Sequence, residues 1–98
     1  MKTVKQEFQT TKKLLRHVME KYPYTRDNDT ILYLACLTEL GVSNFREAEV
    51  CGLSIISVHK TRQYIQNKEG ECLPSDVTRK HRRERQIEIR DLFREWGA

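Results

Sequence analysis

Apolar side chains in the first 22 residues recur at steps of three and four, which is the spacing of one helical face. The positions on this face are Val4, Phe8, Thr11, Leu15, Val18 and Tyr22. Pro23 should end the helix, because the residue before a proline avoids the α region. The pattern therefore predicts one continuous amphipathic helix from about residue 4 to residue 22.

The next segment, Thr30–Leu40, is apolar on nearly every side of a helical projection. A buried strand is the competing interpretation. The length of the segment, its Leu and Ala content and the Gly41 that follows it favour a central helix. A polar turn over residues 24–29 precedes this helix, and Asp27 or Asp29 is expected to cap its first backbone N–H groups.

Residues 44–67 predict two helices joined by a tight corner. Asn44 and Glu47 fit a capping box at the start of a short helix that ends near Cys51. Gly52 can adopt the positive φ of the corner, and Ser54 can cap a second helix that runs to about Asn67. The expected inner face of this second helix is Ile55, Val58, Thr61 or Arg62, and Ile65.

Helix, glycine corner and helix together form the layout of a helix-turn-helix DNA reader. Ala48 is small enough for the two helices to approach, while Leu53 and Val58 can fix the second helix to the core. Thr61 stands where an apolar residue is usual. The side chains expected to face DNA are Ser54, Ile55, Ile56, His59, Lys60 and Gln63. Ile55 and Ile56 fit thymine methyl groups or a protein partner, and Ile55 can also turn inward.

A last helix is predicted from Val77 to about Trp96, with Ser75 or Asp76 as its cap. Its second half is amphipathic, through Ile89, Leu92, Phe93 and Trp96. This apolar face can close the chain's own core or pair with a second copy, which leaves a homodimer open.

The first half of that helix has no apolar face, and it carries the net charge of the chain. Residues 79–85 hold five of the 18 Lys and Arg residues and one of the 14 Asp and Glu residues, so the whole net charge of +4 lies there. The cations are Arg79, Lys80, Arg82, Arg83 and Arg85. Arginine forks match phosphate oxygens well. The alternative is a solvated helix with weak internal ion pairs.

Two short motifs resemble those of small helix-turn-helix proteins of Gram-positive bacteriophages and prophages. Residues 57–66 (SVHKTRQYIQ) are similar to a Ser-Val-x-x-x-Arg-x-x-Ile-Gln pattern in the second helix of that family. Residues 25–29 (TRDND) are similar to an upstream Thr-Arg-x-x-Asp segment, and Pro74 precedes an Arg/Glu-rich helix in the same way. The resemblance spans about residues 22–96. It implies a phage accessory protein, in a family whose activity is mostly unassigned.

Other functional classes find little support in the sequence. The three cysteines include no Cys-x-x-Cys pair, and no two of the three histidines share i, i+4 spacing, so neither a disulfide framework nor a metal site is expected. No nucleophile or phosphate-loop motif is present, which argues against an enzyme and against a cofactor. The longest apolar run, residues 31–37, is too short for a membrane span, and residues 1–13 do not resemble a signal peptide. A cytoplasmic location is expected.

The sequence thus predicts a single all-α domain, residues 1–98, of four to five helices. It contains a helix-turn-helix at about 45–67 and a long basic C-terminal helix at about 77–96. The expected function is DNA binding by a phage-type accessory or regulatory protein. Major-groove contacts are expected from Ser54, Ile56, His59, Lys60 and Gln63, and phosphate contacts from Arg62, Arg79, Lys80, Arg82, Arg83 and Arg85. The alternative is a module that binds a host or phage protein without nucleic acid.

Overall fold

The computed structural model describes residues 1–96, and it describes all of their side chains except those of residues 88, 89 and 91–96. The helices are α1 (Val4–Glu7), α2 (Thr11–Lys21), α3 (Asp29–Glu39), α4 (Phe45–Val50), α5 (Ile55–Gln63) and α6 (Asp76–Trp96). A 3-10 turn, η1 (Pro23–Asp27), precedes α3, and a π-helical turn, η2 (Tyr64–Lys68), extends α5. No strand occurs in residues 1–96, so the prediction of an all-α fold is confirmed.

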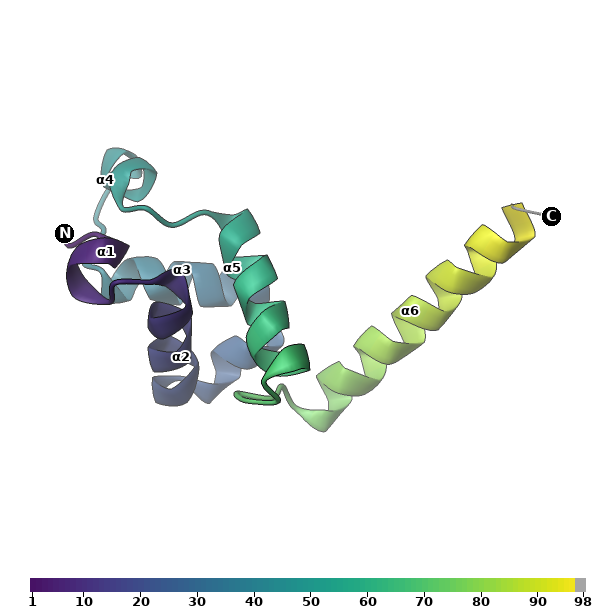
Figure 1. Ribbon diagram of the computed structural model, residues 1–98. Coiled ribbons are helices and arrows are strands. Elements are labelled where there is room, and N and C mark those ends of the chain that lie inside the picture. Colours follow the sequence, from purple (N-terminus) through teal and green to yellow (C-terminus); the bar gives the residue numbers. More distant parts are fainter. Residues whose placement is uncertain (97–98) are drawn as a thin grey trace.

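Three helices, α2, α3 and α5, pack against one another around a single core (Figure 1). The largest fully buried apolar side chains are Leu14, Leu15, Val18 and Met19 of α2, Leu32 and Cys36 of α3, Cys51 at the C-cap of α4, Val58 of α5 and Ile65 of η2. Burying one side chain of the Leu, Ile or Val type contributes about 1.5–3 kcal/mol. The core therefore fixes which face of α5 turns inward, and Val58 lies on that face as predicted.

The predicted first helix is divided into two helices. Gln9 adopts a φ of 69°, and the hydroxyl of Thr10 then caps α2 by accepting from the backbone N–H of Lys13 at 3.2 Å. Val4 and Phe8 still pack on the core after this break. The prediction of one continuous helix was wrong because the apolar stripe follows the core around a corner, and a threonine cap makes that corner.

The central helix α3 confirms the prediction from its sequence, but its cap differs. Asn28 is the N-cap, and its side-chain oxygen accepts from the backbone N–H of Ile31 at 3.1 Å. Asp27 and Asp29 are thereby left for other contacts. Although α3 is apolar on nearly every side, only one face packs on α2 and α5, and Leu34 remains 55% exposed on the outer face.

The corner between α4 and α5 lies at Gly52, as predicted, with a φ of 88°. Asn44 caps α4 by accepting from the backbone N–H of Glu47, and Ser54 caps α5 by accepting from that of Ser57. These caps explain why both helices begin where the sequence predicts.

The packing around α4 differs from the expected arrangement. This helix buries none of its side chains, and Phe45 at its start is 95% exposed. Ala48, expected at a close contact with α5, lies instead in an apolar groove beside Leu34 and Val42. The helices that pack against α5 are α2 and α3, while α4 stands apart from the core (Figure 1). Ile55, one of the expected inner positions, is 43% exposed for the same reason.

The last helix, α6, begins beside the end of α5 and extends away from the three-helix core (Figure 1). The connector before it turns at Gly70 and Cys72, where φ is 64° and 48°. Arg16 of α2 holds this connector by contacts of 2.6 Å with Glu69 and 2.8 Å with Glu71. The apolar face expected at Ile89, Leu92, Phe93 and Trp96 lies outside the described side chains.

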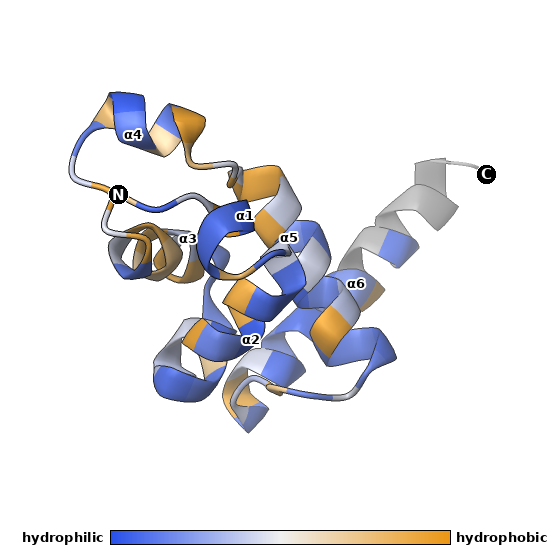
Figure 2. Ribbon diagram, turned by 60° about the vertical axis from the view of Figure 1, so that its left-hand side comes forward, coloured by the Kyte–Doolittle hydropathy of each residue, from blue (hydrophilic) through white to orange (hydrophobic). Residues whose placement is uncertain are grey.

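Hydropathy follows this arrangement of the helices. The first half of α6 is mostly hydrophilic, and hydrophobic segments appear at the end of α4 and the start of α5 (Figure 2). No helix among the described residues is both long enough and apolar enough to cross a bilayer.

Candidate nucleic-acid interface

A groove of about 710 Å³ separates α5 from the first half of α6. Its lining includes His59, Gln63 and Gln66 on one side, Arg79, Arg82, Arg83 and Arg85 on the other, and residues 27–30 between them. With Arg62, the lining holds five arginines and two aspartates, so its net charge is three positive while His59 is neutral. The outward side of α5 and the cationic start of α6, two separate features of the sequence, thus border one groove.

One wall of the groove rests on an ion pair between α3 and α5. The carboxylate of Asp29 accepts from Nε of Arg62 at 2.7 Å, from Nη2 of Arg62 at 2.9 Å and from Nδ1 of His59 at 2.5 Å. Burial by itself would raise the pKa of Asp29, but the hydrogen bonds from Arg62 and His59 outweigh burial and lower the pKa below its ordinary value. The pair therefore pins α5 to α3 with an ionised carboxylate.

The other wall is attached through Gln66, which is only 5% exposed. Its Oε1 accepts from Nη1 of Arg82 on α6 at 3.0 Å and from Nη1 of Arg62 at 3.4 Å. Its Nε2 donates to the backbone carbonyls of Arg26 and Cys72, both at 3.0 Å. One amide thus joins η1, α5, the connector and α6.

Asp27 adds a second attachment for α6. Its Oδ1 accepts from the backbone N–H of Ser75 at 2.8 Å, and its backbone carbonyl accepts from Nη2 of Arg82 at 3.3 Å. Asp27 therefore anchors the start of α6 rather than capping α3.

Two of the predicted phosphate ligands have structural roles instead. Arg62 is 6% exposed and its guanidinium is bound by Asp29 and Gln66, so the prediction that it holds a phosphate was wrong. Its position on the inner side of α5 explains this result. Arg82 is partly buried, and it donates hydrogen bonds to Oε1 of Gln66 and to the backbone carbonyl of Asp27. Only its remaining donors can face a ligand in the groove.

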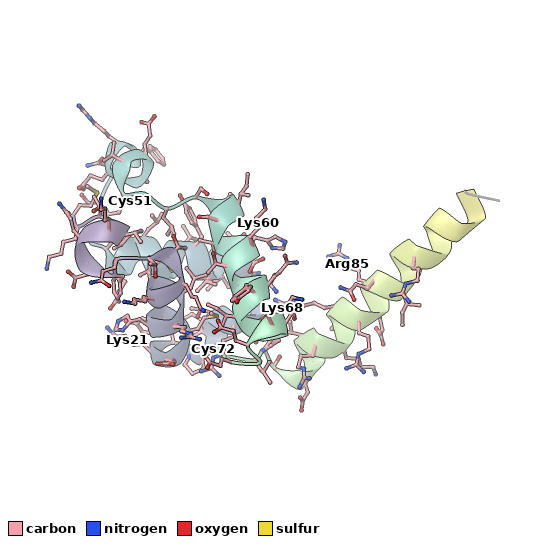
Figure 3. The ribbon with its side chains drawn as sticks, in the orientation of Figure 1. Lys21, Cys51, Lys60, Lys68, Cys72 and Arg85 are labelled. Carbon is pink, nitrogen blue, oxygen red and sulfur yellow. The ribbon has the colours of Figure 1, made fainter. Side chains whose placement is uncertain are left out.

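The other predicted contacts lie on the surface. The exposed residues are Ser54, Ile56, His59, Lys60 and Gln63 on the α5 side and Arg79, Lys80, Arg83 and Arg85 on α6. Figure 3 shows Arg85 on the side of α6 that faces α5, and Lys60 projecting outward from α5. The groove lining includes His59, Gln63, Arg79, Arg83 and Arg85 but not Ser54, Ile56, Lys60 or Lys80. The structure thus brings five of the nine to the groove.

Metal ligands and reactive thiols do not gather at this groove. Within the described residues, no three His, Cys, Asp or Glu side chains converge as a metal site requires. Cys36 is fully buried in the core, where burial and the nearby Glu39 carboxylate raise its pKa to about 12. The groove is therefore suited to binding through charge and hydrogen bonds.

The lowered pKa of Asp29 predicts a loss of stability in acid. A carboxylate with a depressed pKa in the folded state stabilises the fold above its unfolded pKa of about 3.9. This contribution disappears as the pH falls from there through the lowered folded value. Urea unfolding between neutral pH and about pH 2 should show a decline that becomes shallower in Asp29→Asn. The matched control is Glu20→Gln, at an exposed site on α2, whose stability should decline with pH as that of the wild type does. If the stability of Asp29→Asn also declined as steeply as that of the wild type, the prediction would be wrong.

Sequence reasoning missed Gln66, and it assigned Asp27 and Asp29 only a capping role. Both aspartates stand in a polar turn, where capping is the commonest role, so the sequence carried no separate sign of their contacts with α5 and α6. Comparison of the chain with protein-family models, curated proteins and solved structures finds no match. The fold and the site themselves define a small all-α protein with a cationic groove.

Proposed function

We propose that the chain is a DNA-binding accessory or regulatory protein, of the phage type that its motifs resemble, and that duplex DNA binds along α5 and α6. In this proposal α5 acts as the reading helix, with Ser54, Ile56, Lys60 and Gln63 toward the bases. The basic first half of α6 acts as an arm that holds the backbone. The observation that carries the proposal is the shared groove between these two helices.

The chemistry of the groove favours a duplex over a single strand. Proteins that hold single strands stack bases on aromatic rings, whereas the described residues that line this groove include no Phe, Tyr or Trp. Arg79, Arg83 and Arg85 offer guanidinium forks suited to phosphate oxygens. An α-helix fits the major groove of B-DNA, which is about 12 Å wide. The reading element is α5 supported by α3, in place of the expected pair of α4 and α5.

Titration with a pool of random-sequence duplexes tests the proposal. Contacts from three arginines give a slope of about −3 in the logarithm of affinity against the logarithm of salt concentration. Affinity should then fall roughly 40-fold between about 50 and about 200 mM salt. In Arg79→Gln/Arg83→Gln the slope should become shallower by about two, to about −1, so the same change in salt concentration should weaken binding only about fourfold.

The matched control removes two positive charges elsewhere. Lys5 on α1 and Arg46 on α4 are exposed, and neither lines the groove. Lys5→Gln/Arg46→Gln should retain the slope of the wild type. Equal losses in both double variants would mean that net charge alone attracts DNA, and the groove would have no special part in binding.

The second candidate function is binding of another protein, and Phe45 is the observation that favours it. This side chain is 95% exposed beside an apolar groove of about 520 Å³ between α3 and α4, which Leu34, Leu37 and Val42 help to line. Exposed apolar surface of this kind is typical of protein contacts. A wild-type chain that shows no binding to the duplex pool at about 50 mM salt would favour this function over DNA binding.

A further inference from the structure

The hydrogen bond between His59 and Asp29 fixes the position of the proton on the His59 ring. The contact joins Nδ1 of His59 to Oδ2 of Asp29 at 2.5 Å. An ionised carboxylate can only accept hydrogen bonds, so this short contact places a proton on Nδ1. Nη2 of Arg62 also lies 3.3 Å from Nδ1, but its shorter contact, 2.9 Å, is the one in which it donates to Oδ2 of Asp29. In the neutral ring, Nε2 then has a free lone pair and no hydrogen.

The exposure of His59 at the groove makes that lone pair accessible to a ligand. Nε2 lies across the ring from Nδ1, the side chain of His59 is 50% exposed, and His59 lines the groove together with Gln63. Arg62 keeps Asp29 in place by binding both of its oxygens. The ring is therefore held by groups behind it and presents one acceptor outward.

His17 shows the opposite arrangement in the same molecule. Its Nε2 lies 2.8 Å from Oε1 of Glu39, so the same argument places the proton of His17 on Nε2. The two histidines thus present opposite ring nitrogens to a carboxylate. His17 is therefore an internal reference for His59.

We infer that His59 is a specificity-determining residue that accepts a hydrogen bond from an exocyclic amino group of a base. In the major groove such donors are N6 of adenine and N4 of cytosine, whereas N7 and O6 of guanine are acceptors and repel a bare nitrogen. Asp29 is the positioning residue that holds the ring in this state. This inference rests on the proposed function, because it assigns a base contact within the same interface.

The first test needs no DNA. Nitrogen-15 NMR of the imidazole rings at about pH 8, above the ordinary histidine value of about 6.5, should show the proton of His59 on Nδ1 and that of His17 on Nε2. In Asp29→Asn the His59 ring should become a mixture of the two forms, because an amide both donates and accepts. A wild-type His59 with its proton on Nε2 would overturn the inference, whether or not the chain binds DNA.

The second test locates the base. A duplex selected from a random pool by the wild type is resynthesised with purine in place of each adenine, and with pyrimidin-2-one in place of each cytosine, one position at a time. At one position the loss of the amino group should weaken wild-type binding about tenfold and should leave binding by His59→Ala nearly unchanged. His17→Ala should behave as the wild type.

The outcomes separate this inference from the proposed function. If the chain binds duplex DNA in a salt-dependent way, but at every position the loss of the amino group affects the wild type and His59→Ala equally, the role of His59 is overturned and DNA binding stands. Absence of duplex binding overturns DNA binding, and the base contact with it, even where NMR finds the proton on Nδ1.

Discussion

Arg62→Met is expected to destabilise the fold by about 3–5 kcal/mol, the usual cost of removing one partner of a buried ion pair. The side chain of Arg62 is 7% exposed and that of Asp29 is 21% exposed, so water can replace little of what is lost. The thermal midpoint should fall by roughly 15 °C or more in a chain of this size. Urea or thermal unfolding followed by circular dichroism measures both quantities.

A double-mutant cycle shows whether the loss arises from the pair. Asp29→Asn removes the other charge, and Asp29→Asn/Arg62→Met should be destabilised by clearly less than the sum of the two single changes, because no unpaired charge then remains buried. Arg83→Met makes the same chemical change at an exposed position of α6 and should cost less than about 0.5 kcal/mol. Additive effects of the two single changes would show that Arg62 stabilises α5 independently of Asp29.

The local signals in the sequence predicted most of the helix positions. The caps at Asn44 and Ser54 and the corner at Gly52 depend on neighbouring residues alone, and the structure has all three in place. The break at Gln9 was missed because Thr10 lies within an unbroken apolar stripe, where nothing in the periodicity separates two helices from one. Periodicity identifies the face that is buried, but it does not show where the chain bends around the core.

The position of each helix relative to the others was harder to predict. Residues 44–67 have the spacing of a helix-turn-helix, yet α2 and α3, rather than α4, pack against α5. Spacing in the sequence cannot separate these arrangements, because Ala48 and Gly52 fit the motif whichever helix lies beneath α5. The burial of Arg62 could not be predicted for the same reason, because it requires that Asp29 of α3 lie opposite Arg62.

The residues that carry the resemblance to phage proteins turn out to have structural contacts. Thr25 is fully buried and donates to the carbonyl of Tyr22 at 2.7 Å, while Nε of Arg26 donates to the carbonyl of Met19 at 2.9 Å. Asp29, Arg62 and Gln66 form the network beneath the groove, and Ser57 shares the capping box of α5 with Ser54. In this chain the motifs therefore describe how η1, α3 and α5 fit together. The surface residues that would decide a function occupy the variable positions of the second motif, which include His59, Lys60 and Gln63, and positions outside both motifs.

Gln66→Met tests whether one buried amide positions the cationic arm. The change keeps the length of the side chain but removes all four of its hydrogen bonds, which leaves two carbonyls and two guanidinium groups without that partner. Because an unsatisfied buried polar group costs about 1–3 kcal/mol, we expect a loss of about 2–3 kcal/mol in the free energy of unfolding. Gln63→Met is the same substitution at an exposed position one turn earlier, and it should cost less than about 0.5 kcal/mol.

The effect of Gln66→Met should extend beyond stability, because Gln66 and Asp27 are the groups that hold Arg82 of α6. Without the amide, the backbone N–H groups of residues 79–83 should exchange with solvent faster under conditions in which the core helices remain protected. Duplex binding should weaken as well, since α6 would no longer be fixed beside α5. Gln66→Glu separates the two halves of the amide: its carboxylate still accepts from Arg62 and Arg82 but cannot donate to the carbonyls of Arg26 and Cys72. If α6 keeps its protection from exchange in Gln66→Glu and loses it in Gln66→Met, the hydrogen bond from Arg82 to Gln66 orients α6. If both variants lose the protection, the bonds that Gln66 donates to the carbonyls of Arg26 and Cys72 orient α6 through the connector.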